Sequence, residues 1–132
     1  MIPDIEKLVT NHLKAEVTTR VFGETPSNQE TPWVKVTQLD PRTIGSEQAD
    51  YFHAFYMQLD CYAGGNGAQY QGEASLLARQ ARAALVAMPE ETFTDAVVTA
   101  VTFGSCPRIP DTEFDPARQR YILDVYVYAH GK

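Results

Sequence analysis

Hydrophobic residues recur with helical spacing near the start of the chain. The stripe consists of Ile5, Leu8, Val9, His12 and Leu13. Pro3 and Asp4 stand just before it, and both favour a helix start: Pro suits the first turn, and Asp complements the positive end of the helix dipole. The pattern therefore predicts a helix over residues 3–15.

The next segment is typical of strands separated by polar connections. Residues 17–22 are β-branched and aromatic, which predicts a short strand, and residues 24–31 form a polar turn region. Alternating apolar and polar positions predict a second strand over residues 33–39. Residues 40–50 contain Pro, Gly and polar side chains, so we expect a loop there.

The clearest strand pattern covers residues 51–63, where alternation divides the side chains between two faces. The face expected to point inward carries His53, Phe55, Met57, Leu59, Cys61 and Ala63. The opposite face carries Phe52, Ala54, Tyr56, Gln58, Asp60 and Tyr62. An aromatic face that also contains Gln and Asp is what we expect of a strand whose outer side another subunit covers in part.

The second half of the chain predicts one long helix and two more strands. The helix covers residues 68–88 and ends before Pro89, since proline cannot continue it. Residues 97–103 form a strand, residues 104–117 a loop, and residues 120–130 the last strand. Its inward side chains are Tyr121, Leu123, Val125 and Val127, and its outward side chains are Ile122, Asp124, Tyr126 and Tyr128.

The order of elements predicts an α+β fold. One helix precedes three strands, and a second helix precedes two strands. Short joins within each group of strands favour hairpins, and therefore a mostly antiparallel sheet of about five strands. We expect both helices to pack on one face of it. The length of 132 residues fits a single domain covering residues 1–132.

Composition narrows the classes of partner. The formal net charge is −6, and the 11 Lys and Arg residues are scattered, so the chain lacks the basic face of a protein that grips nucleic acid. Cys61 and Cys106 have no metal-binding spacing and are too few for a disulfide framework. The charged N-terminus does not fit a signal peptide, and no run reaches the roughly 18 apolar residues of a membrane span. We expect synthesis in a reducing cytoplasm and no membrane association.

Motifs for chemistry fail at named positions. The glycine cluster before the long helix lacks the Gly-Lys-Ser/Thr of a phosphate loop. The acidic alternation that starts at Asp111 has Pro116 where a calcium loop needs glycine, and Ile122 where it needs glutamate. The histidines stand alone in their elements, and Ser105 lacks the setting of a nucleophile elbow. The sequence predicts no catalytic residue, no metal site and no cofactor.

The unusual surface chemistry is aromatic. Tyr56, Tyr62, Tyr126 and Tyr128 all fall on outer strand faces. Tyrosine suits protein interfaces, because its ring is apolar and its tip is polar. The alternative is that these tyrosines shield a sheet face within one subunit.

The whole-chain pattern resembles the tail terminator family of long-tailed bacteriophages, small proteins that cap the tail tube and join it to the head. The resemblance rests on the order and spacing of many segments across nearly all of the chain. They are the helix beginning at Pro3, the strand end at Gly23, the strand from Pro32 to Val36, the aromatic strand ending at Gly64, the Ala/Arg-rich helix at 73–86, the loop 107–111, and the strand from Arg120 to Val125.

This resemblance implies a structural virion protein at the head–tail junction. It implies a homo-oligomeric ring, a hexamer, around a channel through which DNA passes without sequence-specific binding. The tail tube protein would meet one face of the ring, and head-completion or connector proteins the other. Loops 40–50 and 104–117 are the candidates for contacts between rings. Within these loops the candidate interface residues are Arg42, Ile44, Arg108, Asp111 and Phe114.

Two alternatives remain at this stage. One is a different head–tail connector or minor tail protein of similar size. The other is a small cytosolic enzyme or ligand-binding domain, which predicts a concave pocket with convergent polar groups.

Overall fold

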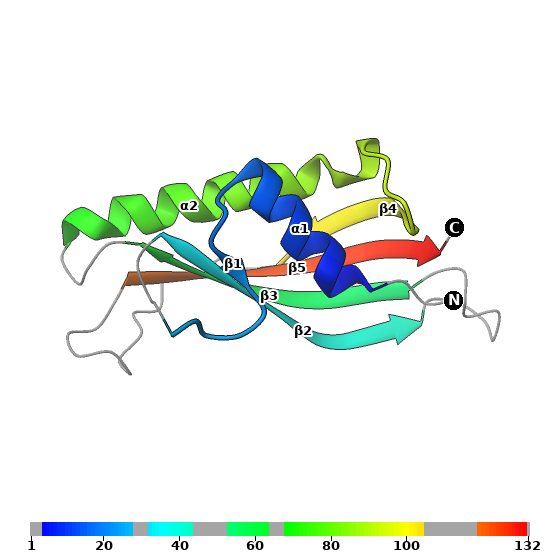
Figure 1. The fold of residues 1–132 in the computed structure, drawn as a ribbon, viewed down its shortest axis with the longest axis horizontal. Helices are drawn as coiled ribbons and strands as arrows, with labels where there is room; N and C mark the ends of the chain where they lie inside the picture. Colours follow the sequence, from blue (N-terminus) through cyan, green and yellow to red (C-terminus); the bar gives the residue numbers. More distant parts are fainter. Residues whose placement is uncertain (1–3, 28–31, 44–52, 64–67, 105–118, 132) are drawn as a thin grey trace.

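The structure is a computed structural model that describes residues 4–27, 32–43, 53–63, 68–104 and 119–131. Its elements, in chain order, are α1 (Ile5–Glu16), β1 (Val21–Phe22), β2 (Trp33–Thr43), β3 (His53–Ala63), α2 (Ala68–Val86), the 3-10 turn η1 (Met88–Glu90), β4 (Ala96–Phe103) and β5 (Gln119–Gly131). The strands form one sheet in the order β1-β2-β3-β5-β4, and both helices lie on the same side of it (Figure 1). The predicted α+β architecture is therefore confirmed.

Helix α1 begins where the sequence places its cap. The Asp4 side chain accepts a hydrogen bond from the backbone N–H of Lys7 at 3.1 Å, which satisfies one of the free donors of the first turn. Ile5, Val9 and Leu13 are completely buried on one side of the helix, as their spacing predicts.

Most of the sheet is antiparallel, as expected, but β1 and β2 run parallel. The predicted hairpin between the first two strands is therefore wrong. Residues 23–32 separate the two strands, and a parallel pair needs a longer return path than an antiparallel hairpin. Strand β1 is also shorter than the predicted strand over residues 17–22, since only Val21 and Phe22 pair with β2.

Strand β2 is longer than predicted and extends into the expected loop 40–50 as far as Thr43. Arg42, placed in that loop by its sequence, lies in the strand opposite Ala54 of β3. The register shifts between Gln38 and Asp40, which is a bulge. Pro41 fits here because β1 pairs only with Val34 and Lys35, so β2 is an edge strand beyond Lys35 among the described residues.

The core lies between the sheet and the two helices. Strands β3 and β5 are central, and their inward side chains meet α2. The core residues of these two strands are Phe55, Met57, Leu59, Cys61, Leu123, Val125, Val127 and Ala129. Helix α2 contributes Ala74, Leu77, Ala78, Ala81 and Leu85. The helix ends at Val86, slightly before the predicted boundary, and Met88 completes the core from η1.

Candidate protein interface on the outer sheet face

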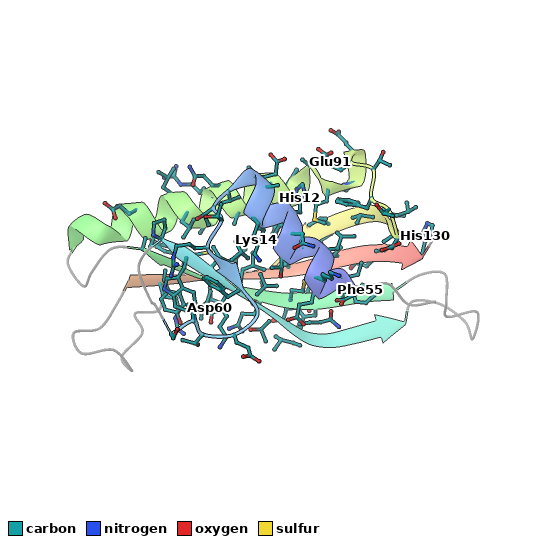
Figure 2. All side chains as sticks on the ribbon, viewed as in Figure 1. His12, Lys14, Phe55, Asp60, Glu91 and His130 are labelled. Carbon is teal, nitrogen blue, oxygen red and sulfur yellow. The ribbon has the colours of Figure 1, made fainter. Side chains whose placement is uncertain are left out.

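The face of the sheet opposite the helices carries the tyrosines that the sequence singled out. Side chains alternate along a strand, and Phe55, Met57 and Leu59 belong to the helix-covered core. The residues between them must therefore point to the other side. Figure 2 shows Asp60 on that side of the sheet, away from His12 of helix α1. The assignment of the two faces is correct for residues 54–63, whereas the side chains of Phe52 and His53 are not among those described.

One end of this outer face is covered within the subunit. Trp33 of β2 lies directly opposite Tyr62 of β3, and their rings stack with centroids 4.2 Å apart and planes inclined by 9°. The ring of Phe22 in β1 also lies beside Trp33, and the centroids of the two rings are 6.4 Å apart. As a result Trp33 is fully buried and Tyr62 is only 4% exposed. Tyr62, a candidate interface residue, is therefore occupied by contacts inside its own chain.

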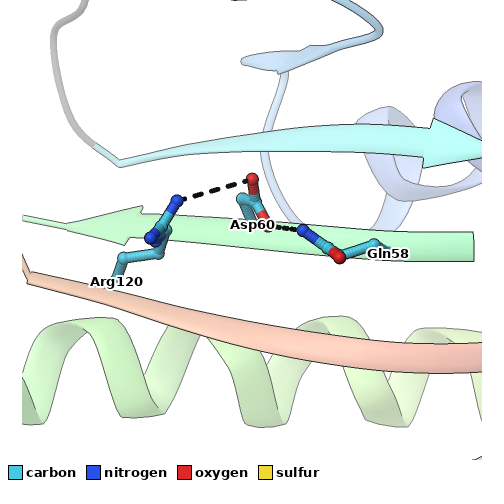
Figure 3. Close-up of polar contacts among 3 residues, drawn as sticks. All are labelled: Gln58, Asp60 and Arg120. Carbon is cyan, nitrogen blue, oxygen red and sulfur yellow. Dashed lines mark hydrogen bonds and ion pairs between the residues drawn. The ribbon is translucent and has the colours of Figure 1, made fainter. Parts of the chain in front are cut away.

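A polar cluster borders this covered end (Figure 3). The amide of Gln58 donates a hydrogen bond to Asp60 at 2.9 Å, and the guanidinium of Arg120 lies 3.9 Å from the other carboxylate oxygen. Arg120 also stands over the ring of Tyr62, 5.9 Å from its centroid. These contacts give Asp60, which is 7% exposed, both a donor and a counter-charge.

The other end of the face is open and aromatic. Tyr56 of β3 and Tyr126 of β5 are register partners, and their rings stack at 4.7 Å with an interplanar angle of 11°. Tyr128 lies two residues further along β5, on the same face. We call Tyr56, Tyr126 and Tyr128 the tyrosine patch. All three are half-buried, although neither helix lies on this side of the sheet (Figure 1).

Asp124 is a charged neighbour of the tyrosine patch. Burial raises the pKa of the Tyr56 phenol above its usual value of 10.0, and the Asp124 carboxylate adds to the rise through its charge and a hydrogen bond. The Tyr56 hydroxyl therefore stays protonated and donates a hydrogen bond to the Asp124 carboxylate. The patch presents flat apolar rings with a fixed polar edge, which is the surface chemistry enriched in protein interfaces.

The structure thus brings Tyr56, Tyr126 and Tyr128 together and separates Tyr62 from them by about 20 Å along β3. The side chain of Arg42 is not among those described. Ile44, Arg108, Asp111 and Phe114 lie outside the described residues, so their proposed contacts stay predictions. Sequence reasoning missed Trp33 and Arg120, whose roles depend on which residue faces them across the sheet.

A small-molecule site is the alternative that a pocket would favour. A hollow of about 440 Å³ lies between α1 and residues 93–96. Two of its polar side chains have structural partners: Asp4 caps α1, and Nε2 of His12 donates to the carbonyl oxygen of Ala84 at 2.8 Å. No serine or cysteine of the described residues lines it. Within the same residues, no group of three metal-binding side chains occurs.

Comparison with known proteins bears on the choice between these sites. No curated protein matches the chain in sequence. In the part of the chain that the structure describes, no helix is long and apolar enough to cross a membrane. A family model described as tail completion protein gp17 matches residues 7–125, which is most of the chain. The chain therefore belongs to the tail completion protein gp17 family and is a structural component of the bacteriophage tail.

Proposed function

We propose that this protein is the tail terminator, a subunit of a hexameric ring that caps the tail tube and joins it to the head-completion proteins. The observation that carries the proposal is the family match over residues 7–125, because tail completion requires a protein that acts where the tube ends. In this role the protein sits at the head–tail junction of the virion, after assembly in the host cytoplasm.

The open outer face supports a role in protein contacts. The stacked pair Tyr56 and Tyr126 exposes aromatic surface that neither helix covers. In a virion, a neighbouring protein would bury these rings. The tyrosine patch is our candidate surface for one such contact, with the tail tube protein or a connector protein as the partner.

The charge of the chain suits a ring around DNA. With a net charge of −6 per subunit, a ring of six copies carries a strongly negative field. A lumen lined by acidic side chains would repel the phosphate groups of DNA. The DNA would then slide through the ring without binding to it. A basic lumen would instead hold the DNA through phosphate neutralisation.

The experiment that tests the proposal combines assembly with microscopy. Native mass spectrometry and light scattering of the purified protein should show a closed oligomer at high concentration or on addition of tail tubes. Negative-stain images should show rings, and density at one end of each tube. A monomer that neither self-associates nor binds tube ends would contradict the proposal.

A further inference from the structure

The two edges of the sheet lie at opposite ends of the strand order and differ in how they are covered. At one end β4 is outermost, and no described strand pairs with its far side. At the other end β1 pairs only with Val34 and Lys35 of β2. The backbone of β2 beyond Lys35 therefore has an open side as well, at least against the described residues.

Strand β4 has almost none of the features that protect an edge. Natural edge strands are guarded by charged residues, proline or bulges, because a free row of N–H and C=O groups pairs readily with another chain. Residues Ala96–Phe103 contain no charge and no proline, and consist mainly of Val, Thr and Phe, which favour strands. The register shift between Val98 and Ala100 is their one irregularity. Thr99 and Thr102 are exposed along this strand.

The open part of β2 divides into two stretches. Its first stretch, residues 36–39, has no charge and no proline, and ends in Leu39, which is 47% exposed. The stretch that follows contains Asp40, Pro41 and Arg42, and these are the guards that β4 lacks. The unguarded edge of β2 is thus confined to residues 36–39.

The absence of charged residues on both edges allows two copies of this acidic chain to pair there. Copies with a net charge of −6 repel one another in general, and like charges placed directly opposite in a sheet are destabilising. Pairing between residues 96–103 and residues 36–39 places no charged side chains opposite each other. The contact joins two different edges of the sheet, which is a head-to-tail geometry, and such contacts form a ring when the rotation between successive subunits closes. Closure also leaves no subunit with a free edge.

We propose that β4 of each subunit pairs, strand to strand, with residues 36–39 of a second copy of this chain. The sheets of successive subunits then continue into one another around the ring. This inference rests on the proposed ring function, and it names the subunit contact within that ring.

A pair of added charges tests the contact. Thr99→Lys with Thr102→Lys places two lysines on β4, whereas Thr19→Lys with Thr94→Lys adds the same charge at exposed positions outside it. The control variant should melt as the native protein does, because Thr19 and Thr94 are exposed. Thr99→Lys also removes the hydrogen bond from the Thr99 hydroxyl to the Tyr128 carbonyl, 3.1 Å, so the β4 variant should melt a few degrees lower and is compared at a temperature where thermal melts show it fully folded. We expect the association constant of the closed oligomer to fall at least tenfold in the β4 variant. In the control variant it should stay unchanged.

Cross-linking gives a second readout that does not depend on charge. Protein carrying Thr99→Cys is mixed with protein carrying Leu39→Cys, both in a Cys106→Ser background that leaves the buried Cys61 as the remaining native thiol. Mild oxidation should join the two variants, while Thr94→Cys in place of Thr99→Cys should give little product.

The outcomes separate this inference from the ring itself. Rings formed equally well by the β4 lysine variant, or equal cross-linking by the control cysteine, would overturn the strand contact and leave the ring standing. Native protein that forms no ring would overturn both. Loss of rings in the β4 variant alone, together with the 99–39 cross-link, would support both.

Discussion

The cost of removing one side chain from each face of β5 distinguishes a core from a contact surface. Leu123 is 1% exposed and lies on the helix-covered face, directly opposite Leu59. Truncation of a buried leucine costs about 2–5 kcal/mol, because apolar contacts are lost and a cavity is left. For a chain of this size, roughly 4 °C of melting temperature is lost per kcal/mol, so Leu123→Ala should melt about 8–20 °C lower.

Tyr126 is three residues further along the same strand, on the open face. Its ring stacks on the ring of Tyr56, and such aromatic pairs contribute about 0.5–1.5 kcal/mol beyond the area they bury. Because Tyr126 is only half-buried, the pair and its buried area together should make Tyr126→Ala cost about 1–2 kcal/mol, or roughly 4–8 °C. A double-mutant cycle with Tyr56→Ala should recover most of that energy as coupling between the two rings.

Urea unfolding and thermal melts of dilute protein provide the measurement, with Trp33 as the fluorescent reporter at the far end of the face. A loss for Tyr126→Ala as large as that for Leu123→Ala would refute the reasoning. The tyrosine patch would then be a second core inside the subunit, which is the alternative that the sequence left open. The open face would no longer be a candidate contact surface.

Three further predictions concern the same outer face. Because the pKa of Tyr56 is raised in the folded protein, its contribution to stability is complete below pH 10.0 and is lost as the pH rises through the folded-state pKa. Tyr56→Phe should therefore flatten the alkaline fall in stability, and an unchanged slope in urea unfolding across this pH range would contradict it. Asp60→Asn removes the attraction to Arg120 across 3.9 Å but keeps an acceptor for Gln58. Because Asp60 is only 7% exposed, urea unfolding should show a loss of about 1–3 kcal/mol in the free energy of unfolding. A loss below about 0.5 kcal/mol would mean that water screens this pair as it screens a surface ion pair. Nε1 of the buried Trp33 has no hydrogen-bond partner among the described residues. Trp33→Phe should therefore cost less than about 2 kcal/mol of stability, well below the roughly 3–5 kcal/mol expected for Trp33→Ala. Equal losses of melting temperature in the two variants would refute this.

The faces of the central strands could be predicted because alternation is a local property. Every second residue of β3 points to the same side whatever its neighbours are, so the inward and outward sets follow from the sequence alone. The burial of Phe55 and Met57, and the outward position of Tyr56, are consequences of that rule.

Contacts that depend on register could not be predicted in this way. The stacking of Trp33 on Tyr62 requires these two residues to be direct partners across β2 and β3. No local pattern fixes that pairing, since a shift by one residue would place a different side chain opposite Tyr62. The covered end of the outer face was missed for this reason.

The end of β2 was misjudged because turn residues have more than one structural meaning. Asp40 and Pro41 favour turns, and on that basis a loop was expected. Proline is also tolerated where a strand has no neighbour on one side, because no ladder hydrogen bond is then required from its nitrogen. The two meanings can be separated only when the strand order is known, and here β1 stops at the partner of Lys35.

The position of β5 between β3 and β4 has a consequence for synthesis. It is the last element in chain order, yet it occupies the interior of the sheet. While the ribosome is still making residues 119–131, β4 has no strand to pair with, and β3 has a partner on one side only. Subunits interrupted before β5 would therefore lack the sheet that presents Tyr56 beside Tyr126. Only a chain translated through β5 can therefore bring Tyr126 and Tyr128 beside Tyr56 and complete the tyrosine patch.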